Sequence, residues 1–144
     1  MYSREESSQI KQEFWTTFGK YMGPVRSSEG MRINWMNYKT GIKDVYFRMD
    51  TLATSAAISI SLEHKDEGIR ELFFEQFQEL KLILEDSLEE EWIWQQPNRI
   101  MKELPDVSVF NKDQWSELIT FFKPRIIALD AFWENAKYNF EALK

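Results

Sequence analysis

Residues 44–63, DVYFRMDTLATSAAISISLE, decide the fold class of this chain. Val45, Phe47 and Met49 alternate with polar residues, which is the pattern of a strand with one buried face. Residues 55–63 repeat this alternation after a short connection. Two such strands in succession predict an antiparallel hairpin whose two apolar faces coincide.

The register of this hairpin follows from the length of its connection. If Asp50 pairs with Ser55, Phe47 lies opposite Ile58 and both side chains point to the same side of the sheet. The same register places residue 44 opposite residue 61.

Helical patterns flank the hairpin. Ser3 and Glu6 form a predicted capping box before an amphipathic helix that ends near Lys20. A second amphipathic stripe covers residues 65–87, and a third follows a predicted capping box at residues 111–114. Pro124 lies inside the third stripe and predicts a kink or break there. Further strands are expected at residues 32–38, 91–95 and 99–103, with a short extended piece at 107–110.

The one-sided strands and the interspersed helices predict an α+β fold. We expect an antiparallel β-sheet with long amphipathic helices packed on one face, in two layers. The length of 144 residues is typical of one domain, so residues 1–144 are expected to form a single α+β domain.

Composition excludes several classes of function. The chain has no cysteine, which excludes disulfides and thiolate metal sites and is typical of a cytoplasmic protein. Its apolar runs are too short to span a membrane, and no signal peptide is recognisable. The five glycines do not form a phosphate-binding loop, so no nucleotide cofactor is expected.

A metal-dependent nuclease is one alternative. Restriction-endonuclease-like nucleases hold a divalent metal with an Asp on one strand and a Glu-x-Lys at the end of its neighbour. Asp44, Glu63 and Lys65 fit this pattern, and the hairpin register makes the two carboxylates diagonal neighbours. Otherwise Asp44 and Glu63 belong to a solvated sheet face, Lys65 belongs to the turn that opens the next helix, and His64 is an exposed residue where the strand becomes a turn. No metal or cofactor is then expected.

Nucleic-acid binding without catalysis is a second alternative. Residues 20–48 carry six basic and two acidic side chains in a chain of net charge −6. Cations can hold a phosphate backbone while aromatic rings stack on unpaired bases. The candidate residues are Arg26, Arg32, Lys39, Lys43, Tyr46 and Arg48.

A protein partner or self-association is the third possibility. Trp92 and Trp94 share one strand face and would form an interaction patch if no helix covers them. Residues 79–91 carry six acidic side chains and one basic side chain, so the basic segment of a second copy could complement them in a homodimer.

Three blocks of sequence resemble a known family. They are residues 35–50 (WMNYKTGIKDVYFRMD), residues 70–84 followed by Trp92-Ile93-Trp94, and residues 109–133. Their aromatic and turn residues resemble the bacterial domain of unknown function 4268 family over nearly the whole chain. The resemblance implies a two-strand element before a Phe-rich helix. It also implies a context of nucleic acids or defence, because the family occurs beside restriction-endonuclease-like domains.

The leading interpretation is a non-enzymatic binding or interaction module. A nucleic-acid-associated protein, with a divalent-metal-dependent nuclease as its extreme form, is the alternative. The polar face of the hairpin discriminates between them.

Overall fold

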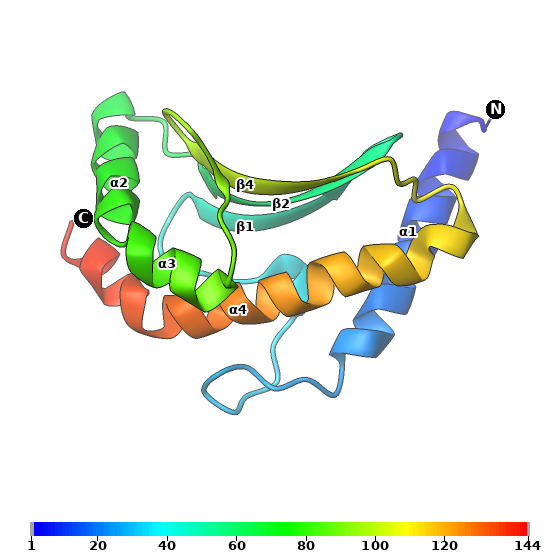
Figure 1. Cartoon of the computed structure of the whole chain (residues 1–144), viewed down its shortest axis with the longest axis horizontal. Helices are drawn as coiled ribbons and strands as arrows, with labels where there is room; N and C mark the ends of the chain where they lie inside the picture. The colour runs from blue at the N-terminus through cyan, green and yellow to red at the C-terminus, as the bar shows by residue number, and fades with distance from the viewer. Residues whose placement is uncertain (1, 144) are drawn as a thin grey trace.

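The computed structural model describes residues 2–143, which form helices on one side of an antiparallel sheet (Figure 1). The order of elements is α1 (Arg4–Met22), η1 (Trp35–Asn37), β1 (Val45–Thr51), β2 (Ser55–Leu62), α2 (Glu67–Glu79), α3 (Lys81–Leu88), β3 (Ile93–Gln95), β4 (Arg99–Pro105), η2 (Lys112–Gln114) and α4 (Trp115–Glu141). The two η elements are 3₁₀ turns. The expected α+β class with helices on one face is confirmed.

The sheet has the strand order β1-β2-β4-β3, with every neighbouring pair antiparallel. Phe47, Ile60, Ile100 and Trp94 form one row across it on the helix side. Ile60 and Ile100 have no exposed surface at the centre of this row. The alternation in the sequence therefore identified the buried face correctly.

The hairpin register differs from the prediction by two residues. Asp50 pairs with Ala57 rather than Ser55, and Phe47 lies opposite Ile60 rather than Ile58. A slip of two keeps every side chain on its predicted face, because side chains along a strand alternate with a period of two. The connection is tighter than expected, since the backbone N–H of Leu52 donates to the carbonyl of Ser55 at 2.8 Å and only two residues lie between them.

Three predicted elements are wrong. Residues 32–38 form no strand but contain η1, where the Asn34 side chain accepts backbone hydrogen bonds. The predicted helix over residues 65–87 is two helices, α2 and α3, with a bend at Leu80 that lets α3 pack along α4. The short extended piece predicted at residues 107–110 is irregular at 107–108 and a turn at 109–110.

At both predicted caps, the side chain of the first residue accepts a hydrogen bond from a backbone N–H. Ser3 and Glu6 form the full capping box of α1. Asn111 caps η2, but Gln114 accepts from the backbone N–H of Ser108 instead of completing a box. The last helix, α4, runs through Pro124 without a break. Of the predicted kink or break, the break is therefore wrong.

Trp92 and Trp94 are covered by other elements and do not form an exposed patch. Trp92 is 5% exposed, and its indole N–H donates to Glu90. Trp94 is half-buried, with its ring edge-on to Phe74 at 5.8 Å between centroids. The most exposed large apolar side chain is instead Leu82 on α3, at 83%.

Glu90 is the centre of a half-buried polar network between the sheet and α4. Arg125 donates two hydrogen bonds to its carboxylate, at 2.8 and 2.9 Å. Lys102 of β4 adds a longer contact at 3.9 Å. Burial alone would raise the pKa of Glu90, but the hydrogen bonds from Arg125 and Trp92 outweigh it and the pKa is lowered.

We expect Glu90→Gln to destabilise the protein by about 2 kcal/mol at pH 7, because it removes the charge from two charge-assisted hydrogen bonds. A carboxyl with a lowered folded pKa stabilises fully above its ordinary value of 4.5, and this stability is lost as the pH falls through the folded value. The difference between wild type and variant should therefore shrink below pH 4.5 in urea unfolding experiments. Glu91→Gln, at the exposed neighbouring residue, is the control. An equal penalty at pH 7 and pH 3 would contradict this account.

Candidate functional site

A cavity of about 310 Å³ lies between α4 and the segment of residues 23–44 that precedes β1. Figure 1 shows the first part of this segment, the loop after α1, on the side of α4 that faces away from the sheet, while the later part passes α4 and leads up to β1. Tyr38, Thr40 and Trp133 belong to its inner wall, while Met31 and Ile33 lie at its exposed side. The volume is at the lower end of the range for sites that bind small ligands.

Asp130 of α4 connects the helix to this segment. One carboxylate oxygen, Oδ2, accepts the backbone N–H of Ser28 at 2.7 Å, and Oδ1 accepts the hydroxyl of Tyr38 at 2.5 Å. The residue is only 5% exposed and lines the cavity. Within residues 2–143, Asp130 forms no ion pair.

Tyr38 is held as a proton donor. Burial, and then its hydrogen bond to Asp130, raise the pKa of its phenol well above the ordinary value. Its ring stacks on Phe47 of β1, with the centroids 5.0 Å apart. The ring of Tyr38 is thereby held against the sheet, and its hydroxyl is held by α4.

Other hydrogen bonds order the segment around the cavity. The indole N–H of Trp133 donates to the carbonyl of Thr40 at 2.7 Å, and that of Trp35 donates to Val25 at 3.1 Å. The hydroxyl of Thr40 reaches the carbonyl of Val45 at 2.8 Å. These bonds satisfy polar groups that would be costly to bury unpaired.

Charged side chains surround the mouth of the cavity. Lys137 of α4 contacts Glu29 at 3.4 Å across the gap between helix and segment. Glu134 and Lys39 also line the cavity, and Lys39 is exposed. With Asp130, the lining residues comprise three acidic and two basic side chains.

Of the three predicted nuclease residues, Asp44 and Glu63 are joined through their backbones. The backbone N–H of Glu63 donates to the carbonyl of Asp44 at 2.7 Å, but both carboxylate oxygens of Glu63 accept from Arg48, at 2.6 and 2.9 Å. The hydrogen bond from Arg48 lowers the pKa of Glu63. Lys65 is exposed in the turn before α2, and His64 accepts the backbone N–H of Asp66 at 3.0 Å.

No group of three or more His, Asp or Glu side chains that could hold a metal ion occurs within residues 2–143. The nuclease hypothesis therefore gains no metal site from the described part of the chain, and it stays a prediction.

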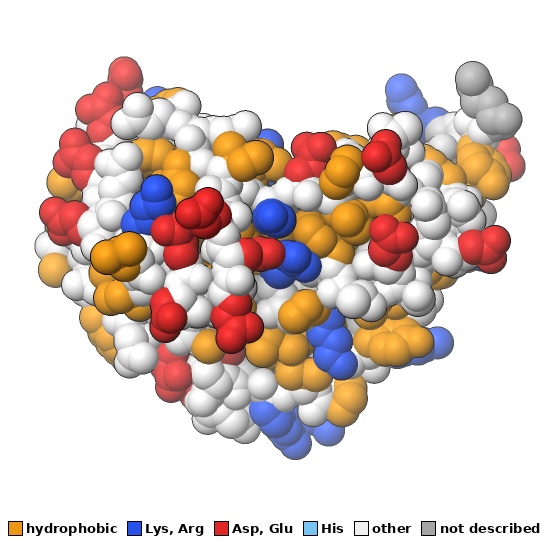
Figure 2. Space-filling model, in the orientation of Figure 1, with side chains coloured by type: hydrophobic (Ala, Val, Ile, Leu, Met, Phe, Trp, Pro, Cys, Tyr) orange, Lys and Arg blue, Asp and Glu red, His pale blue; other side chains and the backbone are white. Residues whose placement is uncertain are grey.

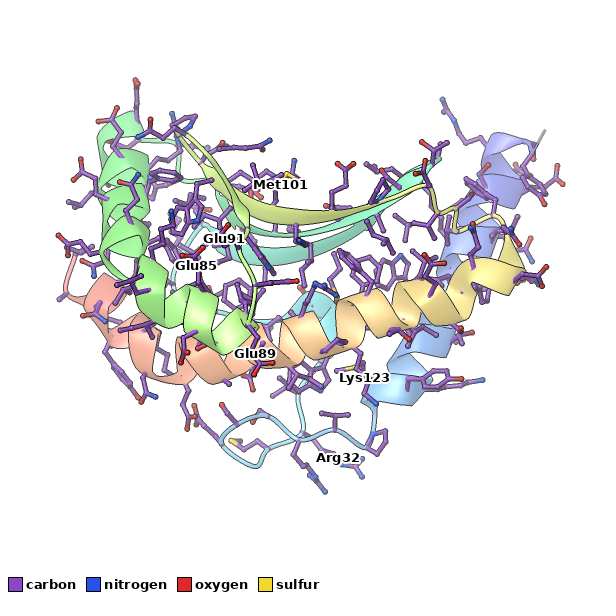
Figure 3. The ribbon with its side chains drawn as sticks, in the orientation of Figure 1. Arg32, Glu85, Glu89, Glu91, Met101 and Lys123 are labelled. Carbon is purple, nitrogen blue, oxygen red and sulfur yellow. The ribbon has the colours of Figure 1, made fainter. Side chains whose placement is uncertain are left out.

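The basic residues of the nucleic-acid hypothesis do not share one surface. Arg32 lies at the end of the molecule opposite the sheet, as Figure 3 shows, whereas Tyr46 and Arg48 lie on the sheet face without helices. Lys39 lines the cavity. Figure 2 shows acidic side chains gathered over α2 and α3 and basic ones over the middle and lower part of the molecule.

Sequence reasoning missed Asp130 and the roles of Tyr38 and Thr40. One signal was present, because Asp130 is a carboxylate between Leu129 and Trp133 in an otherwise apolar stripe of α4. A charged residue on a buried helix face requires compensation. Its partners, however, lie 92 and 102 residues away in the chain.

Comparison with known families identifies the chain. A family model described as a domain of unknown function (DUF4268) matches residues 10–137, which include the hairpin, the cavity segment and Asp130. The chain belongs to the DUF4268 family. No curated protein and no solved structure matched it significantly. No described helix of this DUF4268 domain combines the length and apolar character needed to cross a membrane.

We expect Tyr38→Phe to lower the free energy of unfolding by about 1.5 kcal/mol, because Asp130 loses one of its two donors inside the protein. Urea unfolding measures the change. Tyr138→Phe is the matched control, since Tyr138 is 60% exposed on the same helix as Asp130. Equal stabilities of the two variants would show that the Tyr38 hydroxyl does not support the segment.

Proposed function

We propose that this DUF4268 domain is a non-enzymatic binding module whose ligand site is the cavity between α4 and residues 23–44. The observation that carries the proposal is the buried carboxylate of Asp130 at the cavity wall. Binding sites are concave, largely apolar and supplied with a few fixed polar groups. The aromatic side chains of Tyr38 and Trp133, together with Asp130, provide this combination.

The length of the cavity segment supports the proposal. It spans 22 residues between α1 and β1 and contains only the 3₁₀ turn η1. Connections longer than about 12–15 residues are uncommon in compact domains and are usually functional or disordered. This segment is tied to the rest of the protein by Ser28, Tyr38 and Thr40, so it is ordered around the cavity.

The groups of the cavity favour binding over catalysis. Tyr38 keeps its proton, because its pKa is raised by burial and by Asp130. It therefore acts as a hydrogen-bond donor rather than as a nucleophile or a base. Asp130 is engaged by two donors, which fixes its orientation in the way that binding sites require.

A screen of small aromatic and polar fragments by NMR tests this function. We expect binding fragments to shift the indole N–H resonance of Trp133, which is 1% exposed at the cavity wall. Ile33→Trp should fill the mouth and weaken these fragments about tenfold, because Ile33 lines the cavity and is 36% exposed. Ile93→Trp, at an exposed site on β3, is the control. The proposal fails if no fragment shifts Trp133, or if both variants weaken binding equally.

The sheet face without helices supports a second candidate function, the binding of single-stranded nucleic acid. Tyr46 and Arg48 are neighbours on this face, with the guanidinium carbon 4.3 Å from the ring centroid. Exposed aromatic rings and arginine are the groups that stack on unpaired bases. The ion pair between Arg48 and Glu63 opposes this function, because it neutralises the cation.

Fluorescence anisotropy of labelled single-stranded oligonucleotides at low salt tests the second function. If Tyr46 stacks on a base, Tyr46→Ala should weaken binding about tenfold, whereas Tyr21→Ala on α1 should not. Added magnesium separates binding from cleavage. Decay of the signal below that of the free probe, abolished by Glu63→Gln, would establish the nuclease. A flat titration at low salt would eliminate both nucleic-acid functions.

A further inference from the structure

Within residues 2–143, no lysine or arginine forms an ion pair with the carboxylate of Asp130. Its two hydrogen-bond donors, the backbone N–H of Ser28 and the hydroxyl of Tyr38, are both neutral. Burial of a carboxylate is costly unless a positive group lies beside it. At 5% exposure, bulk water reaches Asp130 poorly.

Glu90 shows how the same fold treats another carboxylate beneath the sheet. Its side chain is 20% exposed, so it is less buried than Asp130, yet two cationic side chains approach it. Arg125 donates two hydrogen bonds to it, and Lys102 lies 3.9 Å away. The carboxylate of Glu90 is paired with the guanidinium of Arg125, whereas the carboxylate of Asp130 borders the cavity.

The carboxylate of Asp130 can still accept. An ionised carboxylate offers about four acceptor positions, of which Ser28 and Tyr38 use two. Asp130 is among the residues that line the cavity, so a donor placed there can approach it.

The remaining lining residues indicate the rest of the ligand. The half-buried ring of Tyr38 lines the cavity beside the buried Trp133, and such an aromatic lining suits an apolar body and attracts a cation. Glu134 lies one helical turn beyond Asp130 and adds a second negative charge. Of the two lysines, Lys137 is engaged by Glu29 at the mouth and Lys39 is exposed.

We infer that the cavity binds a small organic cation, with an amidinium, guanidinium or ammonium group directed at Asp130 and an apolar body against Trp133. The inference rests on the proposed binding function and adds the chemical class of the ligand.

Three isosteric probes test the charge of the ligand. Benzamidine is a cation, benzamide is neutral and benzoate is an anion, while the three have nearly the same shape. Calorimetric titration should give an affinity for benzamidine about tenfold or more above that for benzamide, since a hydrogen bond between charged groups is the stronger one. Benzoate should not bind. The indole N–H resonance of Trp133 reports whether each probe occupies the cavity.

Two variants test whether the preference for the cationic probe arises from the acidic residues of the cavity. Asp130→Asn should reduce the preference for benzamidine over benzamide about tenfold. Because this change also disturbs the contacts to Ser28 and Tyr38, Glu134→Gln provides a milder second variant that should reduce the preference about twofold to threefold by long-range attraction. Glu117→Gln, at an exposed site on α4, should leave the preference unchanged.

The outcomes separate the inference from the function on which it rests. If benzamide or benzoate binds as tightly as benzamidine and shifts Trp133, the cavity binds ligands but not through Asp130, and the inference is overturned. If none of the three shifts Trp133, the inference is overturned too, and the fragment screen decides separately whether the cavity binds ligands at all. A blocked Ala-Arg-Ala tripeptide distinguishes the source of the cation, because it binds only if the cavity accepts a side chain presented by a polypeptide.

Discussion

Trp133 is the residue on which the arrangement of this protein depends. Its ring stacks on Phe77 of α2 with the centroids 6.0 Å apart and meets Phe47 of β1 edge-on at 5.6 Å. Its indole N–H donates to Thr40 in the cavity segment. One side chain of α4 therefore contacts the sheet, a second helix and the segment before β1. Large aromatic side chains stabilise by area and by ring geometry together, so their loss affects every element they contact.

The sequence contained enough information for the sheet but not for its detailed pairing. Alternation over residues 44–63 fixed which side chains face the helices, because only one face of the hairpin is apolar. It did not fix the register, since a slip of two residues preserves those faces. Turn geometry decided the pairing, through the hydrogen bond from the backbone N–H of Leu52 to the carbonyl of Ser55.

The helix boundaries show a second limit. The bend at Leu80 has no glycine or proline to announce it, and an apolar stripe continues across it in the sequence. The bend exists because α3 packs along α4, which is a tertiary effect. Conversely, Pro124 suggested an interruption that α4 does not have. Local propensity is a weak guide where packing against the core decides the outcome.

The candidate site was hidden for a related reason. Tyr38 and Asp130 are ordinary residues in sequence, and their hydrogen bond spans 92 positions. Arg48 and Glu63 looked like parts of two different functional groups, yet they neutralise each other on the sheet. Pairing of this kind is decided by the strand register, so it could not be read before the register was known.

The energetics of residues 23–44 connect the fold to the proposed binding. The hydrogen bonds that tie this segment to α4 come from Ser28, Tyr38 and Thr40, and each contributes about 1 kcal/mol net. Trp35 and Ile42 of the same segment are buried, so apolar packing holds it in place together with these hydrogen bonds. A ligand that contacts both Asp130 and the segment would bind only the ordered arrangement and would stabilise it by mass action. The proposed binding is therefore coupled to the same contacts that order residues 23–44 against α4.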